Sequence, residues 1–156
     1  MITDARCHTE NTINVIFVSG GKDSLAQWLV AIEENVPILP VFADTGHEHP
    51  QTMKYLDYLE KRLGPIKRVR ADFSCRIESK RKFIQTKWPD LLVNDCGMSE
   101  EEAHQRISCA LEILKPTGIP FLDLCLWKGR FPSTKARFCT FELKHEPVRS
   151  QVILPL

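Results

Sequence analysis

The chain has 156 residues, of which 43% are hydrophobic and 26% are charged, and its formal net charge at pH 7 is +1. This length and apolar content predict one globular domain over residues 1–156, with a hydrophobic core of its own. A net charge so close to zero excludes a domain that is basic throughout, as many nucleic-acid-binding domains are.

The sequence shows no signal for export and no segment that could cross a membrane. Residues 1–11 are polar and mixed in charge, unlike a signal peptide, and no apolar stretch approaches membrane-spanning length. The six cysteines are scattered without a Cys-x-x-Cys pair, so they indicate neither a zinc site nor a redox motif. We therefore expect a cytoplasmic protein with reduced thiols and no membrane partner.

The first half of the chain alternates between predicted strands and predicted helices. The apolar runs 13–18 and 38–43 and the short run 66–70 have the composition of strands. Two helices are predicted between them, and the second should begin at Pro50 and end before Gly64. Apolar residues at helical spacing are Leu25, Trp28, Leu29 and Ile32 in the first helix and Met53, Leu56, Leu59 and Leu63 in the second. The alternation predicts a three-layer α/β fold, with helices on both faces of a mainly parallel sheet.

The second half is predicted to be more helical, so that a core over 13–72 precedes a helical and basic region over 73–156. A helix should run from Ser74, as its N-cap, towards Lys87, and Pro89 should interrupt it before a loop at 94–97. Its candidate buried residues are Ile77, Phe83 and Ile84. Ser99 and Glu102 form a capping-box pattern at the start of a further helix, which carries Ala103, Ile107, Ala110, Leu111 and Leu114. The apolar run 121–127 fits a strand and a helix equally well.

The segment Ser19-Gly20-Gly21-Lys22-Asp23-Ser24 links the first predicted strand to the first predicted helix. Its two glycines let the backbone approach an anion closely, and the start of the helix offers N–H groups and the positive end of the helix dipole. Lys22 adds a positive charge and Ser24 a hydroxyl group. The spacing fits neither a Walker A loop nor a Gly-x-Gly-x-x-Gly dinucleotide turn. We expect a phosphate-binding loop, with an ordinary glycine turn as the alternative.

A second candidate segment, Asp44-Thr45-Gly46, follows the second predicted strand. In open parallel sheets, ligands bind beyond the carboxyl ends of the strands. We therefore expect this segment to face the same crevice as Ser19–Ser24. For Asp44 the alternative is an ordinary turn residue at the end of a strand.

Three segments of the sequence carry a family resemblance. Ser19–Ser24 resembles the PP-loop, Ser-Gly-Gly-x-Asp-Ser, of the N-type ATP pyrophosphatase and adenine-nucleotide α-hydrolase superfamily. The sequence from Phe42 to Thr52 is similar to the second-strand motif of phosphoadenosine phosphosulfate reductases. The segment Arg137-Phe138-Cys139-Thr140, with Leu143-Lys144 and Pro147 after it, resembles the Cys…Lys…Pro segment of that family, and Lys128–Pro132 resembles the lead-in of phage and bacterial relatives.

The resemblance implies an enzyme that binds an adenine nucleotide or sulfonucleotide, either ATP with Mg²⁺ or 3′-phosphoadenosine 5′-phosphosulfate. Its ligand would lie on Ser19, Gly20, Gly21, Lys22, Asp23 and Ser24, together with Asp44, Thr45 and Gly46. Lys22, Asp23 and Asp44 would be the catalytic residues, and Asp23 would hold Mg²⁺ through water. The substrate-side wall, which would grip a sulfate, a phosphate or a nucleic-acid backbone, would consist of Lys128, Arg130, Arg137, Cys139 and Lys144.

The chain also departs from that family. The reductases carry a catalytic cysteine well beyond the Cys…Lys…Pro segment, and the iron–sulfur members carry a vicinal cysteine pair, whereas Cys139 is single and no cysteine follows it. We therefore expect no iron–sulfur cluster and a fold that is incomplete at its C-terminus. The alternative function is a non-catalytic nucleotide-binding module, or a truncated remnant, that needs a partner or a missing C-terminal half. A nucleic-acid or sulfur-carrier substrate, and a homo-oligomer or a partner chain, stay open.

Overall fold

The computed structural model describes residues 12–156, which form two compact units. One unit contains residues 12–43 and 48–69, and the other contains residues 44–47 and 70–156. The polar segment 1–11, which we expected not to be a signal peptide, lies outside the described residues. The assignment of the whole chain to one domain stays a prediction.

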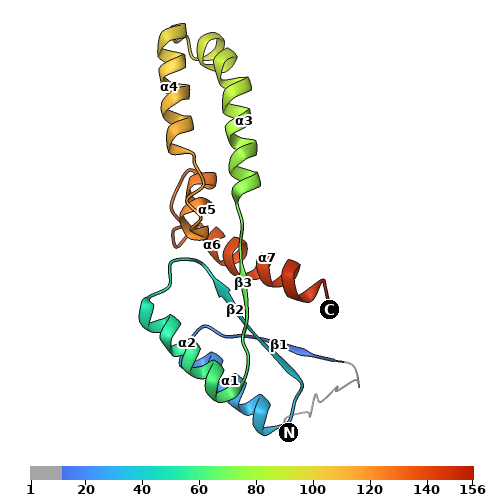
Figure 1. Cartoon of the computed structure of the whole chain (residues 1–156). Coiled ribbons are helices and arrows are strands. Elements are labelled where there is room, and N and C mark those ends of the chain that lie inside the picture. Colours follow the sequence, from blue (N-terminus) through green and yellow to red (C-terminus); the bar gives the residue numbers. More distant parts are fainter. Residues whose placement is uncertain (1–11) are drawn as a thin grey trace. The chain divides into compact units, whose positions relative to one another are not determined.

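The first half of the chain forms a three-stranded sheet with two connecting helices (Figure 1). The elements are β1 (Asn14–Phe17), α1 (Lys22–Glu33), β2 (Ile38–Asp44), α2 (Pro50–Leu63) and β3 (Lys67–Arg70). The strands lie in the order β1-β2-β3, and β1 runs parallel to β2 with Phe17 opposite Val41. The predicted α/β fold, with a parallel sheet flanked by helices, is confirmed.

The core of this first unit lies between the two helices and the strands. Trp28 from α1 packs with Leu56 and Leu59 from α2 and with Phe42 from β2. Right-handed crossovers between strands in consecutive order place both helices on one face of a sheet. Figure 1 shows α1 and α2 close together in this way. The predicted signals at the ends of α2 are confirmed, because the helix begins at Pro50 and Gly64 follows its last residue.

Helix α1 buries less of its apolar surface than its spacing indicates. Trp28 is 1% exposed, whereas Leu29 and Ile32 are 46% and 42% exposed. The helix has apolar residues around most of its circumference, so the periodicity alone does not identify the side that meets the core. Val30, outside the predicted stripe, is 56% exposed.

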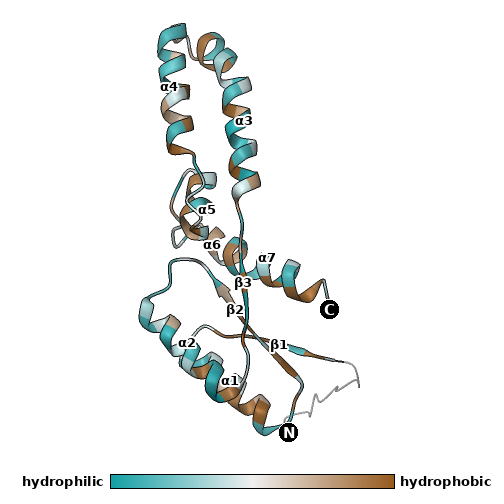
Figure 2. Cartoon of the chain, in the orientation of Figure 1, coloured by the Kyte–Doolittle hydropathy of each residue, from teal (hydrophilic) through white to brown (hydrophobic). Residues whose placement is uncertain are grey.

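The second unit begins with an antiparallel helical hairpin (Figure 1). Helix α3 (Ser74–Asp90) continues into the π-helical turn η1 (Leu91–Asp95), and α4 (Glu100–Ile113) returns beside it. The predicted capping box is confirmed, because Ser99 Oγ accepts the N–H of Glu102 at 3.3 Å and Glu102 Oε2 accepts the N–H of Ser99 at 3.1 Å. Figure 2 shows the first turn of α4 in the teal of hydrophilic residues.

Three predictions for α3 are wrong. Ile77 and Ile84 are buried as expected, but Phe83 is 52% exposed because its side chain lies on the solvent side of α3. The N-cap is Phe73 rather than Ser74, whose N–H and hydroxyl both donate to Asp72 Oδ1, at 2.8 and 2.6 Å. Pro89 does not interrupt the helix, and the expected loop at 94–97 begins as part of the helical turn η1. A proline near a helix end removes only one hydrogen bond, and the wider turns after it accommodate the chain.

The rest of the second unit consists of α5 (Pro120–Lys128) and a helical run that ends at Ile153. That run is divided into α6 (Phe138–Thr140), η2 (Phe141–His145), α7 (Glu146–Val148) and η3 (Arg149–Ile153). The ambiguous run 121–127 is therefore helical, with Pro120 at its start and Gly129 after its end. Buried residues from α3, α5 and η2, together with the residues that cap α3 and α4, form one core, which contains Phe73, Ile77, Ile84, Leu114, Leu124 and Leu143.

The basic cluster at residues 80–82 has a structural role in two of its members. Lys80 Nζ donates to the backbone oxygen of Trp127 at 2.8 Å, near the end of α5. Arg81 donates to the backbone oxygen of Leu114 at 2.7 Å and also to that of Leu111, at the end of α4. Helix C-termini leave carbonyl groups without intrahelical partners and carry partial negative charge. These two cations therefore stabilise helix ends, and Lys82 is exposed.

Candidate nucleotide site

The loop between β1 and α1 is held by hydrogen bonds among its own residues. Ser24 Oγ accepts the N–H of Ser19 at 3.2 Å, lies 3.1 Å from Ser19 Oγ and donates to the backbone oxygen of Gly21 at 3.0 Å. Ser19 Oγ also accepts the N–H of Gly21 at 3.3 Å. The two serines therefore fix the loop as a closed turn, while the remaining backbone N–H groups at the helix start are left for another acceptor.

The start of α1 is suited to an anion. Gly21 is the N-cap, and no side chain there accepts a hydrogen bond from the helix. The first N–H groups of a helix lack intrahelical acceptors, and the helix dipole adds partial positive charge at this end. Lys22 and Asp23 pair at 2.8 Å, with side chains that are 92% and 88% exposed. A pair so exposed is weak, so Lys22 is available to an incoming phosphate.

Helix α2 forms one wall of this loop. Gly20 has φ +74°, and a Cβ atom there would lie 3.2 Å from Thr52 Cγ2 and 3.9 Å from Tyr55 Cδ1. The loop therefore needs glycine at this position both for its backbone conformation and for its approach to α2. Tyr55 is 37% exposed and stacks on Tyr58 with ring centroids 6.2 Å apart. We did not predict this aromatic pair, which the i, i+3 spacing of two tyrosines on a surface helix could have indicated.

The segment after β2 is held by groups of the second unit. Asp44 Oδ1 accepts the N–H of Gly46 at 2.8 Å, and Asp44 Oδ2 lies 3.5 Å from Arg70 Nη1. Gly46 has φ +71°, and a Cβ atom there would lie 2.7 Å from Pro120 Cδ. Asp44 therefore has the geometry of a strand-end turn residue. Its catalytic role, and a crevice shared with Ser19–Ser24, stay predictions.

A buried aspartate that the sequence did not reveal supports this segment. Asp123, on α5, is 4% exposed and accepts hydrogen bonds from Thr117 N at 2.6 Å, Thr117 Oγ1 at 2.7 Å and Gly118 N at 3.1 Å. The backbone oxygen of Gly118 in turn accepts Arg70 Nη2 at 2.8 Å. Asp123 thus fixes the loop that holds Arg70 beside Asp44. The sequence does contain one signal for this residue, because Asp123 is the single carboxylate in the apolar run 121–127.

The predicted substrate-side wall contains a network of charges in the second unit. Glu142 accepts Arg76 Nη1 at 2.6 Å and lies 3.1 Å from Lys128 Nζ. Both cations also lie over the ring of Trp127, at 4.6 Å for Arg76 and 4.1 Å for Lys128. Burial alone would raise the pKa of the Glu142 carboxyl, but the hydrogen bonds and charges of Arg76 and Lys128 outweigh it and lower that pKa. Lys128 is therefore already engaged by a carboxylate of its own chain.

The other predicted wall residues differ in how they are held. Arg130 lies over the ring of Phe138 at 5.6 Å, and Arg137 Nε donates to the backbone oxygen of Thr134 at 3.2 Å. Cys139 is half-buried and Lys144 is exposed. Both arginines are exposed and keep N–H groups for a ligand. A binding role for the whole set stays a prediction.

The lowered pKa of Glu142 predicts a pH-dependent stability. A carboxyl group with a folded-state pKa below its ordinary value of 4.5 stabilises the fold fully above that pH, and this contribution is lost as the pH falls below it. We expect Glu142→Gln to lower the free energy of unfolding by about 1–3 kcal/mol near neutral pH. The difference from the unaltered protein should shrink as the pH falls below 4.5. Urea unfolding across this range measures it, and Glu112→Gln on the exposed side of α4 is the control. A difference that does not change with pH would contradict the assignment.

The comparison with known families agrees with the motif at the start of α1. Residues 13–115, which are about two thirds of the chain, match the phosphoadenosine phosphosulfate reductase domain. The chain belongs to the phosphoadenosine phosphosulfate reductase domain family. The matched range includes Ser19–Ser24, Asp44–Gly46 and the α3–α4 hairpin, whereas the segment from Lys128 to Lys144 lies outside it.

Nearly the whole length of the chain is similar to part of a phage protein. The chain is 70% identical over 152 residues to a protein of Escherichia phage 186 described as "Uncharacterized 37.8 kDa protein in gpa 5'region". The match covers 97% of the chain and 46% of the phage protein, so the chain spans about half the length of this relative. No solved structure matches the chain.

The cysteines of this reductase-family chain differ in their surroundings. Cys75, Cys96 and Cys109 are exposed, Cys125 is buried and Cys139 is half-buried, and none of these five forms a disulfide. Burial, together with the nearby Cys139, raises the pKa of the Cys125 thiol. Because the thiolate is the reactive form, Cys125 is the less reactive kind of thiol.

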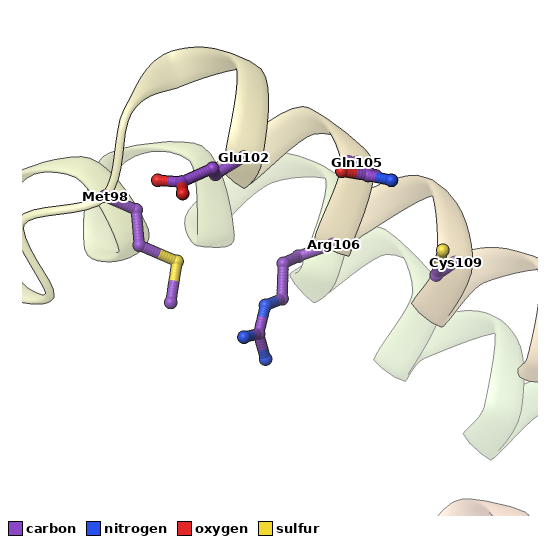
Figure 3. A pocket seen from close by; sticks show the side chains of 5 residues that line it. All are labelled: Met98, Glu102, Gln105, Arg106 and Cys109. Atoms are coloured by element: carbon purple, nitrogen blue, oxygen red, sulfur yellow. The ribbon is translucent and has the colours of Figure 1, made fainter.

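We also searched the described residues for functional sites other than the loop. They include no cluster of three or more His, Cys, Asp or Glu side chains that could hold a metal ion. None of the described helices is long and apolar enough to cross a membrane. A hollow of about 410 Å³ on α4 is lined by Met98, Glu102, Gln105, Arg106 and Cys109. Figure 3 shows that these side chains come from one helix and the turn before it, and Glu102 belongs to the capping box, so we assign no nucleotide to this hollow.

Proposed function

We propose that the chain binds an adenine nucleotide or a sulfonucleotide through Ser19–Ser24, and that it takes part in nucleotidyl-transfer or sulfur-related chemistry. ATP and 3′-phosphoadenosine 5′-phosphosulfate are the two ligands that fit the family. The observation that carries the proposal is the loop itself, in which two serines close a glycine turn at an uncapped helix start.

The loop offers two kinds of support for phosphate binding. Backbone N–H groups at the start of α1 lie together without a side-chain cap, and such groups bind phosphate with the help of the helix dipole. Among the described residues Lys22 pairs with Asp23, and both side chains are almost fully exposed. Because an ion pair so exposed is weak, little free energy is lost when Lys22 turns to a phosphate instead. A phosphate on the loop would replace Asp23 as the partner of Lys22.

With ATP as the ligand, the chemistry would be nucleotidyl transfer. An acceptor oxygen would form a bond to the α-phosphorus as the bond from that phosphorus to the bridging oxygen breaks, and pyrophosphate would leave with the bonding electrons. The protein would contribute position and positive charge, with Lys22 and the loop N–H groups placed against the phosphate oxygens. No protein nucleophile is required.

If ATP is the ligand, the family resemblance implies Mg²⁺ as its metal ion. The loop contains one carboxylate that could hold this ion. The exposed carboxylate of Asp23 is a hard oxygen donor of the kind that Mg²⁺ prefers. Asp23 would hold the ion through water, and the ion would supply charge neutralisation at the phosphates. Because the carboxylate of Asp44 already accepts the Gly46 N–H and pairs with Arg70, it is the weaker candidate.

Titration calorimetry with ATP and with 3′-phosphoadenosine 5′-phosphosulfate tests the proposal. We expect one site per chain, and Lys22→Ala should weaken binding by about tenfold or more, because a charge-assisted contact to phosphate is lost. Lys82→Ala, which removes an exposed lysine of α3, should leave the affinity unchanged. If neither nucleotide binds, the assignment of the loop is wrong.

A non-catalytic nucleotide-binding module is the second candidate. The observation in its favour is Asp44, because hydrogen bonding and an ion pair hold this predicted catalytic carboxylate in a structural role. An assay of pyrophosphate release with ATP and Mg²⁺ separates the two functions. Release that is abolished by Lys22→Ala supports the enzyme, and tight ATP binding without release supports the module.

A further inference from the structure

A hollow of about 590 Å³ lies among three helices of the second unit. Its walls come from α3, α4 and α5 and from the turn that follows α5. Ile84 and Trp88 of α3, Leu114 at the end of α4, and Leu122 and Leu126 of α5 are among the apolar residues that line it. Sites for small organic molecules have volumes of roughly 300–1,000 Å³ and mostly apolar walls. The hollow therefore has the size and the lining of such a site.

The hollow has a buried floor and an exposed apolar rim. Ile84 and Leu114 are 3% and 5% exposed and belong to the core of the second unit. Ile113 and Phe131 also line the hollow, and each is 69% exposed. Large apolar side chains that stay exposed around a concave apolar surface indicate a binding site.

The charges of the hollow have one sign. Among the described residues that line it, Lys80 and Arg130 are basic and none is acidic. Neither of these two cations pairs with a carboxylate within residues 12–156. Because the walls are apolar and both charges are positive, the hollow suits a molecule with an apolar body and an anionic group.

Both cations lie at Gly129, the residue that ends α5. Lys80 Nζ donates to the backbone oxygens of Trp127 at 2.8 Å and Leu126 at 3.5 Å, and it would lie 3.7 Å from a Cβ atom on Gly129. An ammonium group has three N–H donors, so one donor of Lys80 stays available. Arg130 follows Gly129, is exposed and keeps N–H groups for a ligand. The backbone at the end of α5 thus fixes two cations at one side of the hollow.

We propose that this hollow binds a small monocarboxylate with an aliphatic or aromatic body. The apolar body would lie against Trp88 and the floor of the hollow, and the carboxylate would lie at Lys80 and Arg130. The proposal goes beyond the nucleotide function, because the hollow shares no residue with Ser19–Ser24 and contains only Arg130 of the predicted substrate-side wall.

NMR titration of the tryptophan indole N–H signals with octanoate tests the proposal. We expect a saturable shift of the Trp88 signal, which Trp88→Phe identifies, because Trp88 lines the hollow. Trp28 is 1% exposed in the core of the first unit, and its signal is the internal control that should stay unchanged. 1-Octanol has the same chain without the charge and should bind about tenfold more weakly, since the charge-assisted contacts are lost. No shift at Trp88, or equal affinities for octanoate and 1-octanol, overturns the proposal.

Substitutions at the rim locate the site. Ile113→Glu should weaken octanoate binding by about tenfold or more, because it places a carboxylate beside the bound anion, and the exposure of Ile113 leaves the fold intact. Phe83→Glu adds the same charge at a 52% exposed residue of α3 that does not line the hollow, and should leave the affinity unchanged. Arg130→Gln should weaken the binding of octanoate but not that of 1-octanol.

Two results of the rim experiment would contradict the proposal. If Ile113→Glu and Phe83→Glu bind octanoate equally well, the ligand does not lie in the hollow. If the Trp88 signal shifts with protein concentration alone and octanoate adds nothing, a second copy of the chain covers the hollow instead.

Discussion

Asp123→Ala should destabilise the second unit by about 2–4 kcal/mol, the largest effect that we expect from a change outside the nucleotide loop. The carboxylate accepts three hydrogen bonds from Thr117 and Gly118 and is 4% exposed. Alanine would leave two backbone N–H groups without their acceptor. It would also release the loop that holds Arg70 beside Asp44. Urea unfolding measures the loss of stability.

Two milder substitutions make the prediction specific. Thr117→Val removes only the hydroxyl donor and should cost about 1 kcal/mol. Asp123→Asn keeps one acceptor oxygen but places an amide N–H₂ where a second acceptor was needed, so its cost should lie between the other two. If Asp123→Ala is no more destabilising than Thr117→Val, the carboxylate does not hold the loop.

Gly20→Ala should weaken nucleotide binding by about tenfold or more, through strain and displacement of the loop. The glycine has φ +74°, and the added Cβ atom would lie 3.2 Å from Thr52 Cγ2. Either the loop or α2 must move to relieve this contact. If the loop moves, the N–H groups at the start of α1 no longer point at the same phosphate. Titration with ATP and with 3′-phosphoadenosine 5′-phosphosulfate measures the effect.

Gly97→Ala is the matched control for this prediction. Gly97 has φ +67°, and nothing lies within 4 Å of the position that its Cβ atom would occupy. The control therefore carries a similar backbone strain without the contact and away from the loop, and its nucleotide affinity should be unchanged. Equal affinities for the Gly20 and Gly97 variants would mean that the loop does not bind the phosphates.

The elements of the first half were predictable because their signals are local. Pro50 and Gly64 mark the ends of α2, and the β-branched run before Ser19 marks β1. The capping box at Ser99 was equally local. Such signals depend on the backbone preferences of single residues or on hydrogen bonds between residues three apart, so the sequence alone reveals them.

The sequence-based predictions failed for residues whose burial or pairing depends on partners far along the chain. Phe83 has the composition of a core residue, but the packing of α4 selects Ile77 and Ile84 instead. Glu142 was not singled out, because its partners Arg76 and Lys128 are distant in sequence and meet only in the folded unit. Asp123 was likewise hidden, since its run fitted a strand as well as a helix.

The central claim is that the backbone N–H groups at the start of α1 bind nucleotide phosphates. Amide NMR spectra recorded during titration with ATP and with 3′-phosphoadenosine 5′-phosphosulfate test it most directly. We predict saturable shifts with at least one of these ligands, concentrated on the amides from Gly20 to Ser24. Saturable shifts that leave these amides unchanged, or no shifts with either nucleotide, would contradict the account.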